Sequence, residues 1–197
     1  MATIELKENT SELSDSELVK ESLKNQDFFF YIIKRYETKL ISYINRLTNV
    51  NNDEAQDILQ DVFLKVYLNL NDYKDDLKFS SWIYRIAHNQ VISNYRKISA
   101  RPEGHSLNID EIATKNIIAD VNIDLSTDLT IARENISRIL SKMSRNNREI
   151  LILKFLEEKS YREISDIIKK PQGTIASMIN RAKKEFIKIA NENNIQF

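Results

Sequence analysis

Two helical patterns follow one another in residues 53–97, which read DEAQDILQDVFLKVYLNLNDYKDDLKFSSWIYRIAHNQVISNYRK. In the first, apolar residues recur at intervals of three and four from Ala55 to Leu70, which is the spacing of one face of a helix. Residues 71–78 are polar and predict a loop. A second pattern runs from Phe79 to Tyr95 with a broad apolar face. This stretch therefore predicts two amphipathic helices that pack against one another.

Helical signals continue on both sides of this stretch. Capping boxes at residues 14–17 and 160–163 each predict the start of a helix, and Asp53 with Gln56 provides a third start signal. The first helix should bend near residues 25–27, and further helices are expected over 128–143, 146–156 and 174–190. Only two glycines and two prolines occur in 197 residues, which favours long helices over strands. We therefore predict an all-α fold.

The chain is expected to divide into two small helical domains. Residues 101–127 hold one of the two prolines and one of the two glycines, and their charges are mostly acidic, so they predict a flexible acidic linker. We expect a flexible tail at residues 1–13, an N-terminal helical domain at 14–100 and a C-terminal domain at 128–197. In the C-terminal domain a short helix, a turn at 169–173 and a basic helix predict a helix-turn-helix.

Composition narrows the range of functions. The chain has no cysteine, which excludes disulfides and thiolate chemistry. It shows no signal-peptide pattern and no apolar run of membrane-spanning length, so we expect a cytoplasmic protein without membrane insertion. His88 and His105 are the only histidines, and no glycine-rich phosphate loop occurs. We therefore expect no enzyme activity, no catalytic residue, no metal site and no cofactor.

The positive charge is concentrated in two segments. Residues 77–102 and 167–184 each contain five Lys or Arg residues and no carboxylate, although the formal net charge of the whole chain is zero. A neutral chain is poorly suited to hold DNA tightly by itself, because that affinity comes largely from cations that neutralise phosphates. The distribution predicts two weak contacts with one polyanion, assisted by a partner.

Residues 53–97 resemble the polymerase-binding and promoter-melting region of bacterial RNA polymerase sigma factors of the extracytoplasmic-function (ECF) subfamily. Residues 160–184, SYREISDIIKKPQGTIASMINRAKK, resemble the C-terminal helix-turn-helix of the same family. A helix-turn-helix alone is shared by many regulators, whereas an acidic helix followed by the aromatic and basic FSSWIYRIAHN segment is specific to sigma factors. The resemblance implies core RNA polymerase and promoter DNA as partners, and it allows an anti-sigma protein. Polymerase contacts are implied with the coiled coil of the largest subunit and with the flap region.

The resemblance also implies roles for particular side chains. One side of the helix that begins near Asp53 would dock on the basic coiled coil, although its periodicity alone favours a plain solvated face. This docking side consists of Glu54, Asp57, Gln60 and Asp61.

Promoter melting needs aromatic faces that stack on bases and cations that contact phosphates. By resemblance, the loop at residues 72–79 would form the pocket for a flipped base. The residues expected to contact the promoter element nearest the start site are Lys78, Tyr84, Arg85, Asn89, Ser93, Arg96 and Lys97. Of the two aromatic residues in this segment, we assign Tyr84 rather than Trp82 to DNA, because one is expected to be a core residue.

A recognition helix presents short polar and basic side chains to the major groove. The residues expected to contact the upstream promoter element are Lys170, Gln172, Thr174, Ser177, Arg181 and Lys184. The family pattern resembles Gly-Thr-Val-Lys-Ser-Arg, but here Ala176 and Met178 replace the two cations. Lys169 stands where a glycine is usual, at a cost of about 1 kcal/mol if its backbone is left-handed.

Two alternatives stay open at this level. A stand-alone helix-turn-helix regulator would bind DNA without polymerase, but it leaves the acidic helix and the second basic segment unexplained. The linker at 101–127 is either an acidic nucleic-acid mimic within polymerase channels or a plain tether.

Overall fold

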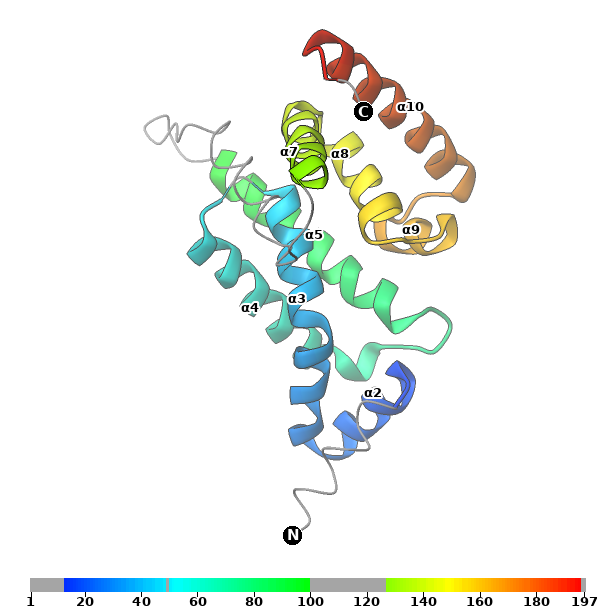
Figure 1. Cartoon of the computed structure of the whole chain (residues 1–197). Helices are drawn as coiled ribbons and strands as arrows, with labels where there is room; N and C mark the ends of the chain where they lie inside the picture. Colours follow the sequence, from blue (N-terminus) through cyan, green and yellow to red (C-terminus); the bar gives the residue numbers. More distant parts are fainter. Residues whose placement is uncertain (1–12, 49, 100–126, 196–197) are drawn as a thin grey trace.

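The structure, a computed structural model, describes residues 13–48, 50–99 and 127–195 (Figure 1). The described residues form helices and no strand, as the sequence predicts. The N-terminal domain consists of α2 (Asp15–Lys24), η1 (Gln26–Phe28), α3 (Phe29–Leu47), α4 (Asn52–Leu68), η2 (Leu70–Asp72) and α5 (Phe79–Ser99). The C-terminal domain consists of α7 (Thr127–Lys142), α8 (Arg145–Leu151), η3 (Ile152–Leu156), α9 (Tyr161–Ile168) and α10 (Gln172–Glu192).

In the N-terminal domain, α3 packs against α4 and α5, and α2 closes one end of this bundle. The predicted apolar positions form its core: Leu40, Ile58, Val62 and Ile83 are at most 4% exposed. The capping box at Ser14 is formed, since the backbone N–H of Ser14 donates to Glu17 Oε2 at 2.8 Å. The bend predicted near residues 25–27 is the short helix η1.

Two helices begin earlier than predicted, one of them by one residue and the other by two. Helix α4 begins at Asn52 rather than near Asp53, because the side chain of Asn51 accepts a hydrogen bond from the backbone N–H of Glu54 at 2.8 Å. The last helix begins at Gln172 rather than Thr174, directly after Pro171. Asparagine is as good a cap as aspartate, so the two signals compete in this sequence.

The C-terminal domain packs α10 against α8 and α9, with Ile139, Ile150 and Ile164 fully buried. The buried guanidinium of Arg148 donates from Nη2 to the backbone oxygens of Ser141 at 2.8 Å and Met143 at 3.2 Å. These bonds satisfy carbonyls at the end of α7 that have no partner within the helix. The single helix predicted over 146–156 is α8 followed by a π-helical turn, η3.

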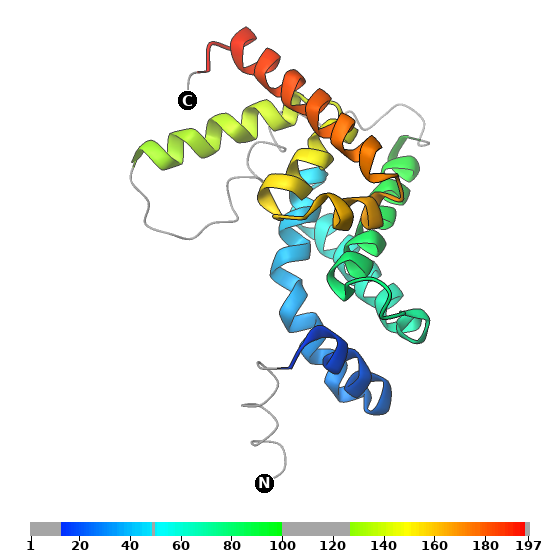
Figure 2. The ribbon, with the colours of Figure 1, turned by 90° about the vertical axis from the view of Figure 1, so that its right-hand side faces the viewer.

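The two domains contact each other, chiefly where α9 packs along α5. Figures 1 and 2 show α2 at one end of the molecule and α10 at the other, with α5 between them. The predicted tail and linker lie outside the described residues, apart from Leu13 and Thr127. Within the described ranges, no helix is both long and apolar enough to cross a membrane.

Candidate polymerase and nucleic-acid interfaces

The predicted docking residues lie along the outer face of α4. Asp57, Gln60 and Asp61 are exposed, and Glu54 is partly buried near the start of the helix. Asp61 also accepts a hydrogen bond from Gln90 of α5 at 2.6 Å, which orients its carboxylate. The acidic groups therefore face away from the core and are accessible to a basic partner.

The same face carries two large apolar residues that the sequence analysis did not single out. Leu64 is 56% exposed and Leu68 is 66% exposed, one and two turns beyond Gln60. Isolated exposed leucines are common on protein surfaces, but here they continue a row of carboxylates on one helix. The face therefore combines charge for orientation with apolar area for affinity.

The second predicted interface, on α5, is divided into an accessible half and a covered half. In the C-terminal half of the helix, Asn89, Arg96 and Lys97 are exposed and Ser93 is partly exposed. Tyr95 is 52% exposed, and the guanidinium of Arg145 from the other domain lies 4.9 Å from its ring centroid. This half can reach nucleic acid in the arrangement described.

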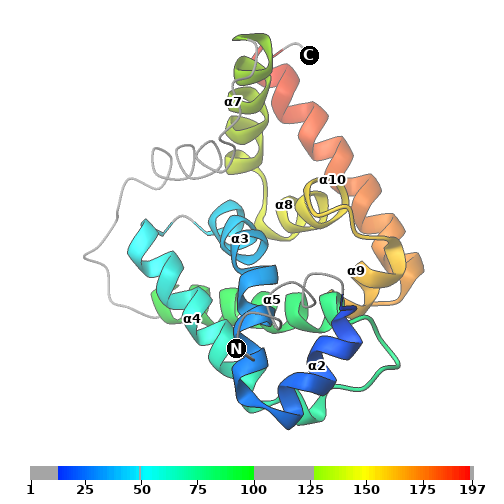
Figure 3. The ribbon, with the colours of Figure 1, turned by 60° about the horizontal axis from the view of Figure 1, so that its bottom comes forward.

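The N-terminal half of α5 is covered by the C-terminal domain, as Figure 3 shows for α9 and the start of α5. Lys78 Nζ lies 3.1 Å from Glu163 Oε1, and Arg85 Nε donates to the backbone oxygen of Asp166 at 2.6 Å. Tyr84 is 1% exposed. Of the two aromatic residues, Tyr84 is therefore the core residue and Trp82 is the partly exposed one, because the ring of Tyr84 packs on Tyr43 of α3 and its hydroxyl donates to Glu157.

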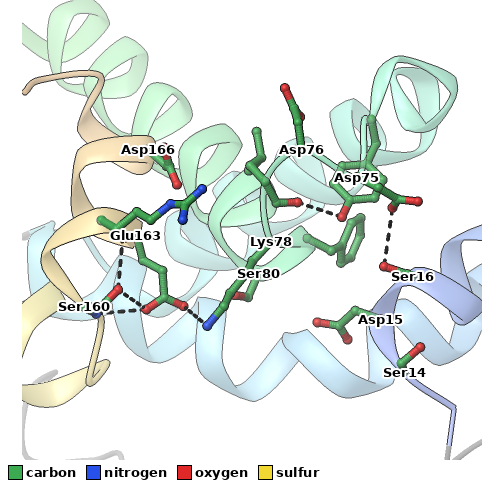
Figure 4. A pocket seen from close by; sticks show the side chains of 14 residues that line it. Ser14, Asp15, Ser16, Asp75, Asp76, Lys78, Ser80, Ser160, Glu163 and Asp166 are labelled. Carbon is green, nitrogen blue, oxygen red and sulfur yellow. Dashed lines mark hydrogen bonds and ion pairs between the residues drawn. The ribbon is translucent and has the colours of Figure 1, made fainter.

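The loop predicted to hold a flipped base lines a cleft between the domains (Figure 4). The cleft has a volume of about 500 Å³. Asp75, Asp76 and Lys78 come from the loop, and Glu163 and Asp166 come from α9. The loop and the helix-turn-helix therefore share one space in this arrangement.

Glu163 pairs with Lys78 across this cleft while it caps its own helix. The backbone N–H of Ser160 donates to Glu163 Oε2 at 2.9 Å, which completes the predicted capping box. Burial acts to raise the pKa of Glu163, but the hydrogen bonds from Ser160 and Lys78 outweigh it and hold the pKa at about 2. The carboxylate is therefore charged at neutral pH.

Two nearly buried carboxylates of the C-terminal domain form hydrogen bonds with side chains of α3 and α5. The two oxygens of Glu157 accept hydrogen bonds from Arg46 Nη1 at 2.8 Å and from the Tyr84 hydroxyl at 2.5 Å. Glu149 Oε1 accepts from the Tyr43 hydroxyl at 2.5 Å and lies 2.5 Å from His88 Nδ1. The side chains of both glutamates are 7% exposed.

Burial, reinforced by these carboxylates, raises the pKa values of Tyr43 and Tyr84 well above the usual range. Both phenols are therefore protonated donors at any physiological pH. The ammonium of Lys159 lies 4.3 Å from the ring centroid of Tyr84, and burial lowers the pKa of this lysine. Tyr84 is thus held by an anion at its hydroxyl and by a cation at its ring face.

The third predicted interface is the outer surface of the helix-turn-helix. Thr174, Ser177 and Arg181 are exposed along one face of α10, opposite the buried Ile175 and Ile179. The remaining predicted contacts on this surface are also exposed: Lys170, Gln172 and Lys184. This geometry presents short polar and basic side chains outward at the start of the second helix, as major-groove recognition requires.

Lys169 ends α9 with φ 55° and ψ 51°, so the left-handed backbone anticipated for this position is present. A β-carbon in this region meets the following carbonyl oxygen. We expect Lys169→Gly to stabilise the C-terminal domain by about 1 kcal/mol in urea unfolding followed by circular dichroism. Lys170→Gly is the matched control, because Lys170 has no positive φ. Glycine at that position relieves no strain and only raises the conformational entropy of the unfolded chain. Equal effects of the two substitutions would contradict the assignment of strain to Lys169.

An apolar groove of about 310 Å³ lies on the C-terminal domain, away from the cleft. It is formed by side chains of α7, the α8–η3 segment and α10: Ile136, Leu140, Leu151, Ile152, Phe155, Leu156, Lys183, Phe186 and Ile187. Phe155 and Ile187 are more than half exposed. A surface of this kind marks a protein-interaction site more often than a nucleic-acid site.

Comparison with known proteins assigns both domains. Residues 32–101 match the family described as Sigma-70 region 2, and residues 133–186 match Sigma-70, region 4. Among solved structures, CnrH in complex with the cytosolic domain of CnrY shares 19% identity and a TM-score of 0.64, over 89% of this chain and 96% of that one. RpoE in complex with the anti-sigma factor NepR from Bartonella quintana shares 20% identity and a TM-score of 0.61, over 83% and 96%. At this identity the two structures show that the fold is shared.

The relatives in sequence are similar over nearly their whole length. The ECF RNA polymerase sigma factor SigW of Bacillus subtilis is 30% identical over 169 residues, which are 81% of this chain and 87% of the relative. The ECF RNA polymerase sigma-E factor of Escherichia coli is 30% identical over 183 residues, 89% of this chain and 93% of the relative. With region 2 in one helical domain and region 4 in the other, this chain belongs to the ECF family of RNA polymerase sigma factors.

Proposed function

We propose that this sigma factor docks on core RNA polymerase through the outer face of α4 and brings α5 and α10 to promoter DNA. The observation that carries this proposal is the exposure of Asp57, Gln60 and Asp61 beside Leu64 and Leu68. Opposite charge brings the partners together in one orientation, and the leucines add apolar area. On a helix face that stays in water, two leucines that are more than half exposed would contribute no stabilising contact.

The promoter contacts follow from the two basic surfaces. The accessible half of α5 offers Asn89 for base edges and Arg96 and Lys97 for phosphates. The outer surface of α10 offers Thr174, Ser177 and Arg181 to the upstream element. Because Ala176 and Met178 replace two customary cations, we propose that the upstream contact depends less on salt than a contact with both cations would.

The polymerase flap region is the partner that we propose for the apolar groove of the C-terminal domain. The groove is apolar except for Lys183 at its edge, so a short helix or loop with an apolar face fits it. An anti-sigma protein would compete for these same surfaces. In its own right the chain acts as a recognition and docking factor in the cytoplasm, and the catalytic step belongs to the polymerase.

The test of this function is run-off transcription with purified bacterial core polymerase on a pool of genomic fragments, with and without this protein. Specific transcripts that require the protein are the expected result. No transcripts, together with polymerase-free binding of the protein to a defined duplex, would instead identify a stand-alone helix-turn-helix regulator. The two outcomes are distinct, because a stand-alone regulator would bind DNA without any contact between the outer face of α4 and polymerase.

A further inference from the structure

We propose that Gln90 of α5 is a positioning residue for polymerase docking, because it keeps the carboxylate of Asp61 apart from the ammonium of Lys65. The inference rests on the proposed function, since it concerns one carboxylate on the docking face of α4. Gln90 is only 5% exposed, so it acts through these two neighbours rather than by direct contact with the partner.

The side-chain amide of Gln90 bridges two charged groups of the neighbouring helix. Gln90 belongs to α5, which packs along α4 (Figure 3). Its Nε2 donates to Asp61 Oδ2 at 2.6 Å, and its Oε1 accepts a hydrogen bond from Lys65 Nζ. A carboxylate only accepts and an ammonium only donates, so the two partners fix which end of the amide faces each of them. An uncharged amide is the side-chain group that satisfies both partners at once.

The spacing of the two charged residues favours a direct ion pair. Asp61 and Lys65 are four residues apart on one helix, and an acidic residue four positions before a cationic one normally pairs with it. In the part of the chain that the structure describes, no ion pair joins the two. Both side chains bond to Gln90 instead, so the amide takes the place of the ion pair that the helix alone would form.

The separation of these charges matters for a partner that is itself basic. A lysine ammonium held against Asp61 would cancel the attraction of this carboxylate for a cation of the partner. The ammonium would also stand opposite the partner's cations, and like charges across an interface oppose binding. By holding Lys65 away, Gln90 preserves the negative charge of the docking face beside Asp57 and Leu64.

The affinity for core polymerase, measured by fluorescence anisotropy on the full chain, tests the role of Gln90. Because the chain has no cysteine, fluorescein can be attached at Thr38→Cys, an exposed position on α3. Gln90→Met keeps the length of the side chain and removes both hydrogen bonds. We expect this variant to bind about fivefold more weakly, because Lys65 then pairs with Asp61 and one exposed ion pair with the partner is lost.

A second substitution distinguishes this role from a merely structural one. Lys65→Met removes the competing cation, so we expect this variant to bind core polymerase at least as tightly as the parent. When Lys65→Met is already present, the addition of Gln90→Met should change the affinity by less than about twofold. If Gln90 acted only through the packing of α5 on α4, its loss would weaken binding equally with and without Lys65.

Asn94→Leu is the matched control, since it removes an amide of similar shape one turn further along α5. We expect it to retain the affinity of the parent within a factor of about two. Unchanged affinity of Gln90→Met would overturn the role of Gln90, and so would a loss of affinity that persists without Lys65.

Failure of the docking face itself gives a different pattern, in which Asp57→Arg binds core polymerase like the parent. If Asp57→Arg weakens binding and Gln90→Met does not, the docking face stands and only the role of Gln90 fails. If neither substitution weakens binding, the docking face lies elsewhere and the role of Gln90 fails with it.

Discussion

Replacing Asp57 with arginine is expected to lower transcription from dependent promoters by roughly 100-fold. Asp57 lies at the centre of the outer face of α4, where the partner is expected to be basic, so the substitution sets two cations against each other. A like-charge contact that Leu64 and Leu68 hold close to the partner costs several kcal/mol, and about 3 kcal/mol corresponds to roughly 100-fold in affinity. Run-off transcription, together with the affinity for core polymerase measured by fluorescence, checks the result.

The matched control for this substitution is Glu37→Arg, which makes the same change of charge at an exposed position on α3. We expect that variant to retain the affinity of the parent within a factor of about two, because surface charges far from an interface act weakly. Asp57 is preferred to Asp61 because the latter accepts a hydrogen bond from Gln90, and its loss would also disturb the packing of α4 on α5. Equal losses with Glu37→Arg would mean that net charge, rather than this face, governs docking.

The second large effect is expected from Ile175→Ala in α10. Ile175 is fully buried beneath the helix-turn-helix, and removal of such a side chain leaves a cavity that costs about 2–5 kcal/mol. That is a large part of the stability of a small domain, so urea unfolding should show an early transition of the C-terminal domain. Transcription that depends on the upstream element should fall with it.

Ile187→Ala makes the identical chemical change in the same helix, but Ile187 is 58% exposed. Its expected effect on unfolding lies within about 0.5 kcal/mol, as for most surface substitutions. A loss of stability of similar size in both variants would mean that the burial of Ile175 does not stabilise the packing of α10.

Local signals in the sequence predicted the helices and which side chains of α4 and α10 lie outward. The capping boxes at Ser14 and Ser160 each cap the helix that follows. Their hydrogen bonds join residues three apart in the chain, so they form irrespective of the rest of the fold. The spacing of the isoleucines in α10 likewise predicts its buried face, and the exposed face lies opposite. Thr174, Ser177 and Arg181 could therefore be placed outward without a structure.

Contacts between domains could not be predicted in this way. Glu149 lies in α8 and Glu157 directly follows η3, and a single-helix pattern assigns acidic residues at such positions to solvent. Their burial comes from α3 and α5, whose residues Tyr43 and Tyr84 lie 106 and 73 residues along the chain from the glutamates that they bind. The same reason applies to Tyr84, whose ring packs on Tyr43 of α3 while its hydroxyl donates to Glu157 of the other domain.

The number of residues in the π-helical turn η3, at Ile152–Leu156, determines whether Glu157 faces Arg46 and Tyr84. A π turn is equivalent to one residue inserted into an α-helix, and each residue turns a helix by about 100°. Glu157 follows the turn directly, with its backbone N–H bonded to the carbonyl of Ile152 at 2.9 Å. Removing one residue from this turn would rotate the position of Glu157 by about 100° around the helix axis, away from Arg46 and Tyr84.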